Sequence, residues 1–137
     1  MTDLPSTAGG HDAAAQPVEL LLAALLGCKT ATAHFVARHL WPRPNHRVLA
    51  INFDDVVAER DERGALALPL AAEPPVTAAL LRVRGVARVQ PASASITAAD
   101  IRQLGALVEQ RCPVAATLTA AGVELAFEWR LETAPTS

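Results

Sequence analysis

The chain has 137 residues, of which 51% are hydrophobic and 19% charged, with a formal net charge of -2 and a pI near 6.0. This balance predicts one globular domain with a large apolar interior, and it argues against a nucleic-acid partner. Two cysteines are too few for a secreted disulfide scaffold.

The N-terminal segment, residues 1–16, is small and polar, which predicts a flexible tail or a loosely docked arm. It lacks the basic stretch that opens a signal peptide. The apolar run over residues 20–28 is shorter than the roughly 20 residues that a bilayer span needs, and Lys29 follows it. We therefore expect a cytoplasmic protein with no membrane partner.

The first long element is a helix predicted over residues 17–40. Pro17 suits its first turn, and Pro42 and Pro44 follow its end. From residue 18 to residue 28 the helix is apolar nearly all round, which predicts burial on every side. The face that carries Cys28 also carries, at helical spacing, Leu21, Ala24, Leu25, Thr32 and Phe35.

Alternating apolar and polar residues predict four strands. They cover residues 46–57, 65–68, 76–89 and 123–131. In the last strand the inward set is Val123, Leu125, Phe127, Trp129 and Leu131. In the third strand Arg82, Arg84 and Arg88 indicate a solvated face.

A second helical region is predicted over residues 97–120. Thr97 and Asp100 resemble a capping box at its start, and Pro113 breaks or restarts the helix. The order of elements predicts an α+β fold, in which an antiparallel sheet packs against the long central helix and this kinked second helix.

The two cysteines, Cys28 and Cys112, lie on apolar faces of these two helices, so only the fold can bring them together. A thiol reacts as its thiolate, and a position just before Pro113 is one where a helix start lowers a thiol pKa. Spacing and burial alone leave two readings open, a redox pair or two structural core cysteines.

Two motifs together resemble the OsmC/Ohr family (osmotically inducible protein and organic hydroperoxide resistance protein). Residues 17–28, P-V-E-L-L-L-A-A-L-L-G-C, are similar to its central-helix motif. Residues 111–118, R-C-P-V-A-A-T-L, followed by A-G-V-E, are similar to its second cysteine motif and last strand. The resemblance covers residues 17–132 and leaves short tails at 1–16 and 133–137.

This resemblance implies an intertwined homodimer with two active sites at the subunit interface. It implies that Cys28 is the peroxidatic thiol, which a peroxide oxidises to a sulfenic acid, and that Cys112 resolves the sulfenic acid as a disulfide. An external dithiol would regenerate the pair, without a cofactor or a metal. Apolar surroundings would suit organic hydroperoxides.

Two features depart from the family pattern. The peroxidases carry an activating Arg before the central helix, and residues 1–16 contain none. The acid that orients this Arg directly follows the Pro, whereas here Val18 takes that place and Glu19 comes one residue later, turned by about 100°. Glu19 is therefore a candidate site residue or simply a first-turn acid that compensates the helix dipole.

A cation that replaces the missing Arg has three candidates, Arg38, Arg82 and Arg111, of which Arg111 is nearest in sequence to a thiol. The ordinary reading of Arg111 is a solvated charge at a helix end. The histidines lack the spacing of metal ligands, and Trp41 and Trp129 are expected in the core or at a dimer interface.

We therefore expect thiol-dependent reduction of organic hydroperoxides in oxidative-stress defence. The candidate site residues are Cys28, Cys112, Glu19 and Arg111. The alternative is a catalytically weak member of the same family that binds an apolar ligand at the dimer interface, with structural cysteines. A third possibility is a purely structural dimer module.

Overall fold

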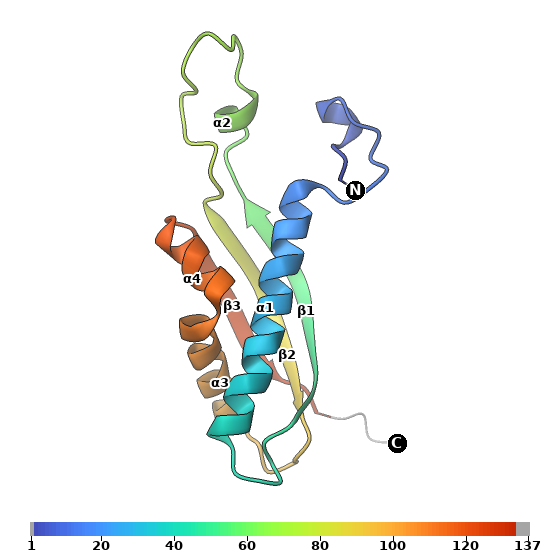
Figure 1. Ribbon diagram of the computed structural model, residues 1–137, viewed down its shortest axis with the longest axis vertical. Coiled ribbons are helices and arrows are strands. Elements are labelled where there is room, and N and C mark those ends of the chain that lie inside the picture. Colours follow the sequence, from blue (N-terminus) through green and yellow to red (C-terminus); the bar gives the residue numbers. More distant parts are fainter. Residues whose placement is uncertain (1, 134–137) are drawn as a thin grey trace.

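Helices cover one face of a small sheet in the computed structural model, which describes residues 2–133 (Figure 1). This arrangement confirms the predicted α+β class. In chain order the elements are η1 (Ser6–Ala8), α1 (Pro17–Leu40), β1 (Val48–Glu59), α2 (Arg63–Leu66), β2 (Arg82–Pro91), α3 (Ala98–Arg111), α4 (Pro113–Ala120) and β3 (Glu124–Leu131).

The sheet has β2 at its centre, with β1 antiparallel and β3 parallel to it. Ala87 of β2 pairs with Phe53 on one side and with Trp129 on the other. The prediction of a wholly antiparallel sheet is therefore wrong. Because β3 returns to the sheet through α3 and α4 and not through a hairpin, it can run parallel to β2.

The excursion between β1 and β2 extends beyond the end of the sheet (Figure 1). The strand predicted over residues 65–68 is wrong, because this stretch lies away from the sheet and has no strand to pair with. Its first part instead belongs to α2, where Asp61 accepts a hydrogen bond from the backbone N–H of Arg63. The strand predicted from residue 76 begins only at Arg82.

Helix α1 lies along the sheet with one face buried and the opposite face exposed. Its buried residues recur every three or four positions and are Leu25, Lys29, Ala33, Val36 and Ala37. Leu20, Leu21 and Phe35 are among its exposed apolar side chains, so the prediction of burial on every side is wrong. Helix α1 is long and apolar enough to cross a membrane, but the core helix of a globular domain can have the same length and composition.

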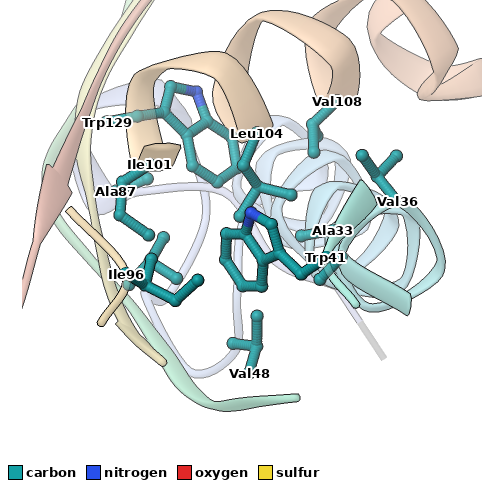
Figure 2. Packing of buried hydrophobic residues seen from close by; sticks show 12 residues of the cluster. Ala33, Val36, Trp41, Val48, Ala87, Ile96, Ile101, Leu104, Val108 and Trp129 are labelled. Atoms are coloured by element: carbon teal, nitrogen blue, oxygen red, sulfur yellow. The ribbon is translucent and has the colours of Figure 1, made fainter. Parts of the chain in front are cut away.

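The main core fills the space between α1, α3 and the sheet (Figure 2). Trp41 and Trp129 are both buried in it, which confirms that the two tryptophans are core residues. Gly105 of α3 lies directly against the Trp129 ring, because a Cβ built there would be 2.2 Å from its Cγ. The α3 side chains in this core are Ile101, Leu104 and Val108.

Helix α3 begins at the predicted capping box. The backbone N–H of Asp100 donates to Thr97 Oγ1 (3.2 Å), and the backbone N–H of Thr97 donates to Asp100 Oδ2 (2.7 Å). The helix ends at Arg111, and Pro113 begins α4 one residue later. The predicted break at Pro113 is therefore confirmed.

The outer face of the sheet is charged, as the strand pattern indicated. Arg84 pairs with Glu59 at 3.0 Å, and Arg88 pairs with Asp54 and Glu132. At the N-terminus, Asp3 accepts hydrogen bonds from backbone N–H groups of its own segment, which includes the short η1 turn. The flexibility expected of residues 1–16 stays a prediction, and the C-terminal tail beyond residue 133 lies outside the described residues.

Candidate thiol site

The two cysteines meet where α1 passes the break between α3 and α4. Cys28 and Cys112 lie close together and shift each other's pKa, and both cysteines are free. They belong to a second, smaller apolar cluster, separate from the tryptophan core. Its buried members are Leu25, Val83, Cys112, Ala115 and Val123, and Cys28 packs against them.

The helix break explains the position of Cys112. Its backbone N–H still donates to the carbonyl of Val108 (2.9 Å), so the residue closes α3. It is also the N-cap of α4, and its Sγ accepts a hydrogen bond from the backbone N–H of Ala115 (3.5 Å). Pro113 has no N–H to satisfy at the first helical position. Of the next two N–H groups of α4, that of Ala115 donates to Cys112 Sγ, and that of Val114 lowers the pKa of Cys28.

Cys28 receives the stronger set of donors. The backbone N–H of Val114 at the start of α4 is the main reason that the pKa of Cys28 is lowered from its ordinary value of 9.0. The thiol of Cys112, the hydroxyl of Thr32 and the positive charge of Lys29 lower this pKa further, while burial opposes them. Donors that bind the charged form stabilise the thiolate.

Cys112 differs in the direction of its shift. Its side chain is completely buried, and this burial is the largest cause of a raised pKa. The neighbouring Cys28 raises it further, although the Ala115 N–H opposes the shift. In a coupled pair the thiol with the lowered pKa ionises first. Cys28 is therefore the thiol of the pair that ionises first, whereas burial disfavours the thiolate of Cys112.

Cys28 opens onto a hollow of about 510 Å³ at the molecular surface. Its lining is mainly apolar, with one cation, and consists of Cys28, Ala31, Thr32, Phe35, Arg111 and Pro113. A second hollow of about 290 Å³ shares Phe35 and Arg111 with the first and continues between α1 and α3. A small apolar molecule can therefore approach Cys28 but not the buried Cys112.

Of the other predicted site residues, only Arg111 lies beside the thiols. It lines the Cys28 hollow, although it is not among the groups that shift the pKa of Cys28. Glu19 accepts a hydrogen bond from the backbone N–H of Gln16 (2.8 Å) in the first turn of α1. It is nine residues from Cys28, about 13 Å along the axis. Within one chain the structure does not bring Glu19 to the thiols.

The remaining arginine candidates lie elsewhere. Arg38 borders a separate hollow with His34, His46 and Arg47. Arg82 pairs with Glu124 on the outer face of the sheet, at 3.6 Å. Across residues 2–133 no three His, Cys, Asp or Glu side chains gather as a metal site would require.

A buried ion pair next to the thiols was not predicted from the sequence. Lys29 is completely buried and its Nζ lies 2.5 Å from the carboxylate of Glu109 on α3. A signal was present, because Lys29 falls four residues from both Leu25 and Ala33 on the face that α1 buries. Lysine is almost never fully buried unless it is paired.

These observations define a class of protein: an α+β domain with a thiol pair at a helix break beside the central helix. The chain belongs to the OsmC-like protein family, whose sequence model matches residues 9–128. Among curated proteins none matches the chain.

Solved structures show the same fold at low identity. An OsmC-like protein from Mycoplasma pneumoniae is 16% identical, with a TM-score of 0.63 and coverage of 96% of this chain and 79% of its own. A Legionella pneumophila organic hydroperoxide resistance protein OsmC, described as a predicted redox protein, is 14% identical, with a TM-score of 0.60 and coverage of 95% and 78%. An OsmC-like protein of unknown function from Vibrio cholerae is 15% identical, with a TM-score of 0.61 and coverage of 90% and 68%.

Proposed function

We propose that this protein is a thiol-dependent peroxidase that reduces organic hydroperoxides and serves in oxidative-stress defence. The observation that carries the proposal is that the two thiols differ in pKa and in accessibility. Cys28 has a lowered pKa and opens onto a hollow, whereas Cys112 has a raised pKa and is buried beside Cys28. An accessible nucleophile beside a protected second thiol suits a two-cysteine redox cycle.

The reaction begins at the Cys28 thiolate. Its sulfur attacks the terminal oxygen of the hydroperoxide, the O–O bond breaks, and the alkoxide leaves and takes up a proton to become an alcohol. Cys28 is thereby oxidised to a sulfenic acid. Arg111, which lines the same hollow, is the cation available to the departing oxygen.

Cys112 completes the oxidation. Its sulfur attacks the Cys28 sulfenic acid and a disulfide forms. The displaced hydroxide takes up the Cys112 proton and leaves as water. An external dithiol then reduces the bridge by thiol–disulfide exchange and is itself oxidised. Over one cycle, a hydroperoxide and a dithiol give an alcohol, water and an oxidised dithiol. The cycle uses no metal or organic cofactor.

A homodimer is part of the proposal. The exposed face of α1 carries an apolar stripe at steps of three and four residues, made of Leu20, Ala24, Gly27, Ala31 and Phe35. Small residues along such a stripe let a second helix approach closely. A second copy of this chain would cover the stripe, as in the intertwined dimer that the resemblance implies. Because Ala31 and Phe35 also line the Cys28 hollow, the second subunit would help to enclose the site. A cytoplasmic location completes the proposal.

Steady-state consumption of cumene hydroperoxide with excess dithiothreitol tests the function. The wild type should turn over, Cys28→Ser should be inactive, and Cys112→Ser should turn over slowly because it lacks the resolving thiol. Gln103→Ser is the matched control, because it places a hydroxyl on the exposed side of α3 and leaves both thiols and the hollow in place.

The contrary result is equally definite. If the wild type consumes no more hydroperoxide than Cys28→Ser, the peroxidase proposal is wrong. Two possibilities would then remain: a family member whose hollows bind an apolar ligand and whose cysteines are structural, and a purely structural dimer module.

A further inference from the structure

The charge of Lys29 is the most unusual feature near the thiols. A lysine ammonium without exposed surface is costly to bury, so its environment must satisfy the charge. Glu109 does so, because both of its carboxylate oxygens accept hydrogen bonds from Lys29 Nζ. The Phe127 ring adds a cation–π contact, with Nζ 4.5 Å from its centroid.

Glu109 is itself held in place from the sheet. The indole N–H of Trp129 donates to Glu109 Oε1 at 3.2 Å. The ion pair therefore joins three elements, α1 through Lys29, α3 through Glu109 and β3 through the two aromatic side chains. Such a network is rigid because each polar group in it has a partner.

The ion pair and the thiol pair bridge the same two helical regions. Lys29 follows Cys28 directly in α1, and Glu109 lies three residues, about one turn, before Cys112. Fixing Lys29 to Glu109 therefore fixes the distance between the Cys28 turn of α1 and the break at Cys112. The positive charge of Lys29 lowers the pKa of both thiols, whereas Glu109 is not among the groups that shift either one.

We propose that Lys29 is a positioning residue for the thiol pair: clamped by Glu109, its buried ammonium holds Cys28 against the start of α4 and supplies the fixed positive charge that favours the Cys28 thiolate. Lys29 thereby takes the part of an activating cation, which none of the arginine candidates fills in this chain. The inference deepens the proposed peroxidase function and rests on it for its purpose, but thiol ionisation can be measured without any peroxide.

The test removes the charge without leaving a lone ion in the interior. The double variant Lys29→Met/Glu109→Gln replaces both ions with side chains of similar size, and the introduced amide keeps an acceptor for the Trp129 indole. The matched control is Arg84→Met/Glu59→Gln, which removes an exposed ion pair from the outer face of the sheet. Thermal unfolding establishes that each variant is folded.

The readout is the rate of iodoacetamide alkylation at Cys28, located by mass spectrometry, as a function of pH. The pH midpoint of the Lys29→Met/Glu109→Gln variant should move upward, and its alkylation rate at pH 7 should fall roughly three- to tenfold. The control should follow the wild type. A folded double variant with the wild-type midpoint would overturn the inference and leave the ion pair a purely structural contact.

A measurement on the wild type covers the case in which the double variant does not fold. The NMR signal of the Lys29 ammonium should shift with the same pH midpoint as Cys28 alkylation, because the two charges interact. A signal that ignores the Cys28 titration would contradict the inference. If the wild type reduces no hydroperoxide but Cys28 still titrates with Lys29, the proposed function fails and the role of Lys29 in thiol ionisation stands.

Discussion

Cys28 and Cys112 lie in the same apolar cluster, yet their pKa values move in opposite directions. The cause lies in the break between α3 and α4. The Val114 N–H that this break frees, together with donors from α1 and the second thiol, serves Cys28, while burial dominates at Cys112. The first turn of α4 thus gives two chemically identical side chains different pKa values.

The first prediction concerns pH. Because the pKa of Cys28 is lowered from 9.0 and that of Cys112 is raised, alkylation at Cys28 should reach half its maximal rate below pH 9.0. At pH 7, iodoacetamide should modify Cys28 well before Cys112, as peptide mapping would show. In denaturant the two should react at similar rates. Preferential labelling of Cys112 in the folded protein would contradict the assignment.

A second prediction isolates the Val114 N–H, the largest cause of the lowered Cys28 pKa. Val114→Pro removes this donor near the start of α4, where proline is tolerated. A hydrogen bond to a charged group contributes about 1.5–3 kcal/mol, so alkylation of Cys28 at pH 7 should slow roughly tenfold or more. Val114→Ala keeps the N–H and serves as the control. Equal rates for both variants would show that the backbone donor has no such role.

Arg111 gives a third prediction, which distinguishes an effect on hydroperoxide reduction from an effect on ionisation of the Cys28 thiol. Arg111 lines the Cys28 hollow but does not shift the Cys28 pKa. Arg111→Met should therefore slow hydroperoxide consumption about tenfold while the pH midpoint of Cys28 alkylation stays the same. Arg38→Met, which alters an exposed arginine of α1 bordering a different hollow, is the control. A shifted midpoint in Arg111→Met would make Arg111 an activating cation.

The exposed stripe on α1 gives a fourth prediction. A Cβ at Gly27 would meet no atom within 4 Å, so a single chain accommodates a large side chain there. Gly27→Trp should nevertheless shift sedimentation from dimer to monomer, because the bulky ring keeps a partner helix away. Gln103→Trp adds the same ring to the exposed side of α3 and should leave the dimer intact. A wild-type monomer at micromolar concentration would contradict the proposed assembly.

A fifth prediction tests the packing of α3 on β3. At Gly105 an added Cβ would lie 2.2 Å from Trp129 Cγ, so Gly105→Ala forces the ring to move. Overpacking costs about 1–3 kcal/mol, against a gain of up to about 1 kcal/mol in helix propensity. We expect a net loss of about 1–2 kcal/mol in the free energy of unfolding, measured in urea. Gln103→Ala, on the exposed side of the same helix, should not destabilise the protein.

The sequence was informative where local chemistry decides structure. The capping box at Thr97, the helix break at Pro113 and the alternation from Val123 to Leu131 all correspond to observed features. The strand at residues 65–68 was wrong because alternating Ala and Leu also suit a helical turn, and only the missing neighbour strand decides between them.

The meeting of the cysteines could not be derived from spacing, since it depends on how α1 crosses the α3–α4 break. The resemblance to a family supplied it. The Lys29–Glu109 pair was not predicted, because Lys29 was considered only as the charge that follows an apolar run. Recognising such a pair needs the tertiary contact between α1 and α3.

The most direct measurement is peptide mapping of the protein after one equivalent of cumene hydroperoxide, without reductant. We expect a single bridge joining the Cys28 and Cys112 peptides of the same chain, and in Cys112→Ser a sulfenic acid trapped on Cys28. Two unmodified thiols after the peroxide has been offered, or oxidation that begins at Cys112, would contradict this expectation.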